Sequence, residues 1–327
     1  MPEKPRQPVK TLSELLQDSK TSDKRRTIVE YIHHHSDEFE KVLDNSFSRD
    51  CDLKDHILDL VDLLSSTLMI RVIEKAITDD DSQIRVKGLQ AAYRTRVDSV
   101  NVQVAHILTN PEEEFEARKW ALHILGSTDP DYYVRKIMRI ARDVSEDVQL
   151  RKEAVFALTK IVNDKTLGTL CMLLGESSVE MRQAGAWALS NIGAPESIIC
   201  LLAALDDEDE SVRDWATRGL RDMDDARALQ GLADAIRSSS PEEQVRMTRI
   251  VIERRSEVIL RVVSELLSSE DSDVRRTAAW ALSVSPYPPA VPSLKTLLDD
   301  QDEQTRDYAR IALIRSGELD STDLKLG

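Results

Sequence analysis

Residues 178–189 read SVEMRQAGAWAL, and residues 271–282 read DSDVRRTAAWAL. In both stretches a polar turn and an apolar residue precede an arginine, Arg182 or Arg275, and small or apolar residues follow it three, six and seven positions later. A third copy, ESVRDWATRGL, surrounds Arg213. Apolar residues at these intervals line one face of an α-helix. The phrase therefore predicts a short amphipathic helix that recurs along the chain.

The basic residue of this phrase recurs at regular intervals. With this residue taken as an anchor, copies lie at Arg25, Lys54, Arg85, Arg118, Arg151, Arg182, Arg213, Arg246, Arg275 and Arg306. The nine intervals cover 281 residues, so the mean period is about 31 residues. A period of this size indicates an array of supersecondary units that fills nearly the whole chain.

Each period contains a second apolar stretch before the anchor helix. Leu229, Leu232 and Ile236 form one example, with the spacing of an amphipathic helix. The turns between helices are rich in Asp, Ser, Glu and Pro, and residues 206–210 are all acidic. Asp and Ser cap helix N-termini, where acidic charge also suits the helix dipole. One period is thus two antiparallel helices, and because one pair cannot bury its apolar faces alone, we expect the pairs to stack into a solenoid.

The composition excludes several other classes of protein. The 327 residues include only 10 Gly and 11 Pro, and aromatic residues make up 4%. Few aromatics argue against a sheet sandwich or barrel. Lys+Arg is 44 and Asp+Glu is 59, so the net charge is −15, and such a charge argues against generic nucleic-acid binding.

The compartment can also be predicted. The first ten residues contain no apolar stretch and do not resemble a signal peptide, and no run approaches the roughly 18 apolar residues of a membrane span. Cys51, Cys171 and Cys200 are far apart and odd in number, which favours reduced, buried thiols over a disulfide framework. We therefore expect a cytoplasmic protein without a membrane segment.

The phrase V-R-x-x-A-x-x-A-L, preceded by an L-x-x-L-L-x-D/E helix, resembles HEAT repeats, and most closely the short HEAT-like repeats of the phycobilisome lyase type. The resemblance covers residues 11–316 and leaves residues 1–10 as a flexible N-terminus and 317–327 as a C-terminal tail. It implies an all-α fold, a right-handed α-solenoid of about ten helix pairs. In that family the first helices line the convex face and the anchor helices the concave face. The resemblance also implies an internal ladder of anchors, each bonded to acidic or carbonyl groups of neighbouring turns: Arg85, Arg118, Arg151, Arg182, Arg213, Arg275 and Arg306.

A helical wheel identifies side chains that should face outward. With 100° per residue, the fifth position after the anchor points away from the buried stripe. From Phe156 onward this row is mostly large and apolar, and an arginine-rich stretch lies beside it. Exposed apolar strips and Trp are typical of binding surfaces, and Arg binds carboxylates through two parallel bonds. The predicted concave-face surface comprises Phe156, Trp187, Arg218, Arg221, Val251, Arg254, Arg255, Trp280 and Ile311. The alternatives are that each Trp packs on the next repeat and that the arginines pair with nearby acids.

The copy at Arg246 departs from the pattern. Its sequence, VRMTRIVIERRSEV, places Arg249 where the other copies have Ala, Gly or Ile. A charge cannot be buried there without a partner. Either this helix is rotated, or Arg249 has a carboxylate partner, or the stack bends between residues 240 and 258.

Sequence motifs for catalysis are missing. There is no nucleotide-binding glycine loop, no H-E-x-x-H, no C-x-x-C and no G-x-S-x-G, and His33, His34 and His35 are consecutive, so they point in different directions on a helix. We expect neither a cofactor nor a metal. The sequence favours a non-catalytic scaffold or adaptor that binds a protein partner, such as an acidic or extended segment. The alternatives are a subunit of a bilin lyase-type complex and a helical-repeat protein that processes nucleic acid.

Overall fold

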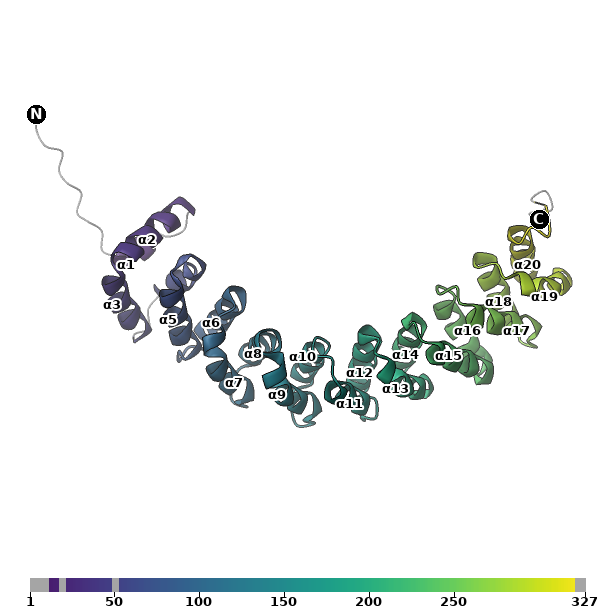
Figure 1. Cartoon of the computed structure of the whole chain (residues 1–327), viewed down its shortest axis with the longest axis horizontal. Helices are drawn as coiled ribbons and strands as arrows, with labels where there is room; N and C mark the ends of the chain where they lie inside the picture. Colours follow the sequence, from purple (N-terminus) through teal and green to yellow (C-terminus); the bar gives the residue numbers. More distant parts are fainter. Residues whose placement is uncertain (1–11, 18–21, 49–52, 321–327) are drawn as a thin grey trace, which may run out of the picture. The chain divides into compact units, whose positions relative to one another are not determined.

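The structure, a computed structural model, describes residues 12–17, 22–48 and 53–320. These residues form helices and short connections without a strand, as Figure 1 shows. The chain divides into two compact units, residues 1–161 and residues 162–327. The predicted loose ends, residues 1–10 and 317–327, lie outside the described residues except for residues 317–320. Each unit consists of helix pairs, and the all-α solenoid fold is confirmed.

Unit 1 contains the helices before residue 161. They are α1 (Leu12–Gln17), α2 (Ser22–His34), α3 (Ser36–Phe47), α4 (Leu53–Leu58), η1 (Val61–Leu63), α5 (Ser66–Ile77), α6 (Ser82–Thr95), η2 (Asp98–Val100), α7 (Asn101–Thr109), α8 (Phe115–Thr128), α9 (Pro130–Arg142) and α10 (Val148–Leu158). From α5 onward they alternate between first helices and anchor-bearing second helices. α6 packs on α8, and α8 packs on α10.

Unit 2 repeats the same arrangement. Its elements are α11 (Asp164–Leu173), α12 (Val179–Ile192), η3 (Pro195–Ser197), α13 (Ile198–Ala203), η4 (Ala204–Asp206), α14 (Glu210–Asp222), α15 (Ala226–Ser238), α16 (Pro241–Val251), α17 (Glu257–Glu265), η5 (Leu266–Ser268), α18 (Ser272–Val284), η6 (Pro288–Ala290), α19 (Val291–Thr296), η7 (Leu297–Asp299) and α20 (Glu303–Arg315). In Figure 1 the second helices α12, α14, α16, α18 and α20 lie on one side of this unit and the first helices on the other. We call the former the second-helix layer and the latter the first-helix layer.

The acidic turns start the second helices as the sequence predicts. The side chains of Asp209, Asp271 and Asp302 accept backbone N–H bonds from the first turns of α14, α18 and α20. These bonds satisfy donors that have no partner inside the helix. In each second helix from α6 onward the anchor position is the fourth residue.

The arginine ladder is confirmed. Arg182 donates from Nη1 to the carbonyl of Glu176 at 2.9 Å and from Nε to Asp207 at 2.9 Å. Arg275 makes the same pair of contacts, to Ser269 O at 2.8 Å and to Asp300 at 2.7 Å. The hydrogen bond from Arg275 lowers the pKa of Asp300. Each such arginine thus joins the turn before its own helix to the turn one repeat later.

The helices of the second-helix layer approach closely because small residues lie between them. A Cβ added to Gly219 in α14 would lie 2.9 Å from the Cα of Ser190 in α12. Larger side chains cannot fit there without moving a helix. The core is completed by the seventh residue after each anchor, which is fully buried at Leu189, Leu220, Leu282 and Leu313.

The repeat around α16 is in a different register from the one predicted. α16 begins at Pro241, so its fourth residue is Gln244 and not Arg246. Gln244 lies 31 residues after Arg213 and 31 residues before Arg275. The predicted anchor at Arg246 is therefore wrong by two residues. Of the three explanations left open, the structure supports the rotated helix, since Arg249 faces solvent, and Arg249 has no carboxylate partner among the described residues.

The cysteines also differ from the prediction. Cys171 of α11 and Cys200 of α13 form a disulfide, with 5.7 Å between their Cα atoms. They are 29 residues apart, which is close to one repeat, so they lie on the first helices of adjacent pairs. The expectation of reduced thiols is wrong for these two residues, and Cys51 lies outside the described residues.

Candidate functional site

The corrected register produces one row of side chains across the second-helix layer of unit 2. It consists of the ninth residue of each second helix, and successive members are 31 residues apart. Adjacent second helices pack against each other from α12 to α20. We call this set the central row, and its members are Trp187, Arg218, Arg249, Trp280 and Ile311.

The two arginines of the central row are available to a ligand. Arg218 and Arg249 are exposed, and neither has a hydrogen bond or ion pair to another described residue. Trp187, Trp280 and Ile311 are half-buried, so each both packs on a neighbour and presents part of its surface. The predictions that Trp187, Arg218, Trp280 and Ile311 lie on the outer face of their helices therefore agree with the structure, while their binding role stays a prediction.

Two acidic groups between α14 and α16, Asp214 and Glu243, are paired with other arginines. Arg246 forms ion pairs with Asp214 and with Glu243, the latter at 2.6 Å. Arg213 also reaches Glu243, at 2.7 Å. Two arginines thus balance two carboxylates between α14 and α16. The charges of Arg218 and Arg249 remain uncompensated within the described part of unit 2.

Two surface hollows share Arg249 and Arg276 in their linings. The first, of about 370 Å³, is lined by Arg249, Arg276, Thr277, Trp280, Gln304 and Tyr308, and we call it the aromatic hollow. The second, of about 470 Å³, is lined by Ser240, Pro241, Glu242, Val245, Arg249, Asp271, Asp273 and Arg276, and we call it the acidic hollow. Three carboxylates line the acidic hollow and none lines the aromatic hollow. An anion is therefore favoured in the aromatic hollow.

Arg276 contributes less free charge than Arg249. It contacts Asp273, and its Nη1 lies 3.5 Å from Asp302. Asp302 also caps α20 by accepting from the backbone N–H of Thr305. It accepts from the hydroxyl of Thr305 as well, and this second hydrogen bond lowers the pKa of Asp302. Arg249 is thus the uncompensated cation that faces the aromatic hollow.

Two of the predicted surface residues are buried. Val251 is 0% exposed, because it is the seventh residue after Gln244 and packs in the core. Arg221 is 9% exposed, and its guanidinium donates to Asp222 at 2.7 Å and to the carbonyl of Ile250 at 3.0 Å. Its hydrogen bond to Asp222 raises the pKa of Arg221. The prediction that these two residues face outward is wrong.

The remaining predicted arginines lie after the end of α16. Arg254 is half-buried and pairs with Asp224 at 2.8 Å. Arg255 is exposed and has no partner among the described residues. Because α16 ends at Val251, neither belongs to the central row. They lie in the turn that leads to α17.

In unit 1 the equivalent row consists of Gln90, His123 and Phe156, so two of its three members are aromatic. Phe156 is 39% exposed, as predicted, and contacts the ring of His123 edge-on with 6.4 Å between centroids. The ammonium of Lys160 lies 4.9 Å from the Phe156 ring. His123 also lies 5.8 Å from Trp120, and burial among these rings lowers the pKa of His123. The exposed ring of this cluster, Phe156, thus already has the Lys160 ammonium as its cation.

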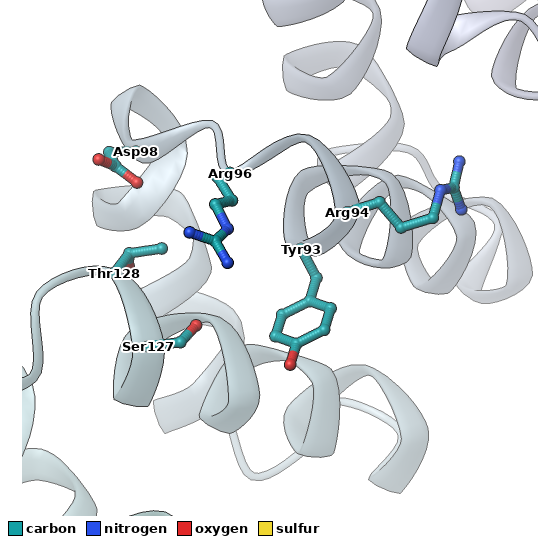
Figure 2. A pocket seen from close by; sticks show the side chains of 6 residues that line it. All are labelled: Tyr93, Arg94, Arg96, Asp98, Ser127 and Thr128. Carbon is teal, nitrogen blue, oxygen red and sulfur yellow. The ribbon is translucent and has the colours of Figure 1, made fainter. Parts of the chain in front are cut away.

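A further hollow of about 500 Å³ lies at the end of α6 in unit 1. Figure 2 shows Arg96 directed between Tyr93 and the Ser127–Thr128 end of α8, whereas Arg94 points away. Arg94 pairs with Asp62 at 3.2 Å. Asp98 lines the same hollow as Arg96, so the site carries both signs of charge and favours an anion less than the aromatic hollow does.

The 31-residue period of the sequence also indicates that Arg249 and Tyr308 lie on this surface. Arg249 lies 31 residues from both Arg218 and Trp280, and this interval is the period itself. Tyr308 lies 31 residues after Thr277 on the same face. Among the described residues no cluster of His, Cys, Asp and Glu is arranged to hold a metal. Within the same residues, no helix has the length and apolar character needed to cross a bilayer.

The comparisons with known proteins agree on the repeat. A model described as HEAT repeats matches residues 134–221, 180–251 and 229–314, together 134–314, which is more than half of the chain. The match is to HEAT repeats in general and does not single out the phycobilisome lyase type. No curated protein sequence matches the chain significantly.

Solved structures with similar folds include nuclear transport receptors. A chain of the Kap95:Nup1 complex is 14% identical with a TM-score of 0.56, over 94% of this chain and 51% of that one. Kap121p bound to RanGTP is 13% identical with a TM-score of 0.52, over 93% and 41% of the chains. Importin beta is 12% identical with a TM-score of 0.50, over 95% and 52%. This chain thus spans about half the length of these proteins, and the likeness concerns the fold. Its repeats place the chain in the HEAT-repeat family.

Proposed function

We propose that this protein is a non-catalytic HEAT-repeat scaffold whose second-helix layer in unit 2 binds an acidic, extended segment of a protein partner. By its resemblance to HEAT repeats, this layer corresponds to the concave side. The central row supplies the contacts, with Arg218 and Arg249 as cations and Trp187 and Trp280 as apolar platforms. Val251 and Arg221 take no part, because they are buried.

One observation carries the proposal. Along unit 2 the arginines of the ladder and most arginines of the surface are paired with carboxylates or carbonyls. Apart from Arg255 in the turn after α16, the arginines of unit 2 that have no partner among the described residues are Arg218 and Arg249. They lie on adjacent helices, at the same position, between two tryptophans. Arg and Trp are the residue types that dominate binding energy at protein interfaces. In a chain of net charge −15, this local positive pair selects an acidic ligand.

The similar folds support the general role only. Two of them were solved with a protein partner, Nup1 or RanGTP, so a HEAT-repeat solenoid of this kind can hold another protein. The identity of 13–14% carries no information on which partner this chain binds.

The test compares two charge-reversed proteins. Arg218→Glu with Arg249→Glu changes the central row, and Arg227→Glu with Arg261→Glu makes the same change in charge on α15 and α17 of the first-helix layer. The wild type and each variant are expressed in the cell that naturally makes this protein and are purified from it, and co-purifying proteins are identified by mass spectrometry. Each candidate is then prepared pure, and its Kd is measured by calorimetry.

We expect a purified partner that binds the wild type and the first-helix-layer variant alike but binds the central-row variant at least about tenfold more weakly. Circular dichroism of both variants should match the wild type. If every purified partner binds all three proteins equally, the second-helix layer is not the binding surface.

A further inference from the structure

The central row has a spacing that restricts the conformation of its ligand. Packed helices lie about 8–10 Å apart. Trp187, Arg218, Arg249 and Trp280 occupy equivalent positions on four successive helices, each packed on the next. A segment that crosses this layer therefore meets one of these side chains about every 9 Å.

Of the extended conformations, polyproline II fits this spacing. It has three residues per turn and rises 3.1 Å per residue, so every third side chain points the same way after about 9 Å. In a β-strand the side chains alternate, so every third residue points to the opposite face. Tryptophan also suits this conformation, because aromatic-lined grooves bind proline-rich segments.

The charges fix which ligand residues lie where. Arg218 and Arg249 are the uncompensated cations at the centre of the row, and half-buried tryptophans flank them on both sides. The aromatic hollow beside Arg249 has no carboxylate in its lining and includes Trp280 and Tyr308. A ligand segment that places a carboxylate on Arg249 would thus place its next contact, a proline or another apolar residue, on Trp280.

We infer that the ligand is an acidic polyproline II segment with two carboxylates three residues apart and an apolar residue, such as proline, three residues outside each of them. This inference rests on the proposed function and specifies the spacing of its ligand. Arg249 recognises one carboxylate and Arg218 the other, each through parallel N–H donors. Trp187 and Trp280 each receive one apolar residue.

The test uses two fluorescent decapeptides of identical composition, with five prolines, three serines and two glutamates and with proline at both ends. In the first peptide the glutamates are at the fourth and seventh positions. In the second they are at the fourth and sixth, so that they point to different sides of a polyproline II helix. A third peptide has glutamine in place of both glutamates of the first. Binding to the full chain is measured by fluorescence anisotropy, and circular dichroism reports the peptide conformation.

We expect the first peptide to bind about tenfold more tightly than the second, because the second loses one charged contact. Arg249→Gln should abolish this preference, and Arg249→Lys should restore part of the affinity through charge without the paired geometry. If both acidic peptides bind equally and more tightly than the glutamine peptide, the spacing is wrong while the acidic-ligand function stands. If all three bind alike, both the spacing and the acidic-ligand function are wrong.

Discussion

Gln244 in α16 occupies the place that Arg213 occupies in α14. Both are the fourth residue of their helix. Arg213 donates from Nη1 to the carbonyl of Asp207 at 2.7 Å, and Gln244 donates from Nε2 to the carbonyl of Ile236 at 3.1 Å. The repeat at α16 thus keeps the hydrogen bond of the ladder to the preceding segment but has no charge with which to reach the next turn.

The ladder should therefore be weaker at Gln244 than at a charged anchor. Arg182→Ala leaves the carboxylate of Asp207, whose side chain is only 10% exposed, without its arginine partner, and we expect it to lower the free energy of unfolding by about 3 kcal/mol. Gln244→Ala removes one neutral hydrogen bond and should cost about 1 kcal/mol. Urea unfolding followed by circular dichroism measures both. Equal losses for the two variants would contradict the neutral character of this anchor.

The register of α16 predicts opposite outcomes for two nearby residues. Val251→Asp places a charge in the core and should lower the free energy of unfolding by more than about 3 kcal/mol. Arg249→Glu changes an exposed side chain and should stay within about 0.5 kcal/mol of the wild type. Thermal unfolding of the two variants distinguishes the registers. If the Val251→Asp protein is as stable as the wild type, Val251 is not buried and the register described for α16 is wrong.

The disulfide predicts the number of reactive thiols. The chain has three cysteines, of which Cys171 and Cys200 are joined, so the unfolded, unreduced protein should react with one equivalent of a thiol reagent. After reduction it should react with three. Since the disulfide closes a loop across 29 residues, its reduction should lower the free energy of unfolding by about 3 kcal/mol. Three reactive thiols before reduction would show that the disulfide is missing in solution.

The pKa of His123 predicts a pH dependence in unit 1. Burial lowers the pKa of His123 from 6.5, so the unfolded state takes up the proton at a higher pH than the folded state does. The unfolded state then binds more protons just below pH 6.5, and stability should fall as the pH drops through this range. NMR titration of His123 should give a midpoint below 6.5.

The control for this prediction is His123→Gln. This variant should lose less stability between pH 7.5 and pH 5.5 than the wild type does, because its side chain does not titrate. If the two proteins show the same pH dependence, or if His123 titrates above 6.5, its burial does not control its protonation.

Much of the fold follows from the repeated phrase alone. Every anchor arginine that follows a capped turn lies at the fourth position of its helix, so Arg182, Arg213 and Arg275 predicted both the helices and their ladder. The prediction failed at α16, because two residues there resemble the phrase without containing the anchor. The pair Val245–Arg246 resembles the anchor phrase, while the actual anchor is Gln244, which local sequence does not mark.

The rest could not be predicted because it depends on neighbouring repeats. Arg221 points outward on a wheel of its own helix, but the carbonyl of Ile250 in the next repeat binds and buries it. The pairing of Cys171 with Cys200 likewise requires two first helices to lie side by side. A wheel describes one helix, whereas each of these contacts joins two.

Charge reversal of the central row tests whether Arg218 and Arg249 select an acidic ligand. The peptide with glutamates at its fourth and seventh positions and an otherwise identical peptide with lysines there are titrated into the wild type and into the protein carrying Arg218→Glu and Arg249→Glu. The protein carrying Arg227→Glu and Arg261→Glu is the control for net charge. We predict that the wild type and the control prefer the acidic peptide and that the central-row variant prefers the basic one. The same preference in all three proteins would contradict it.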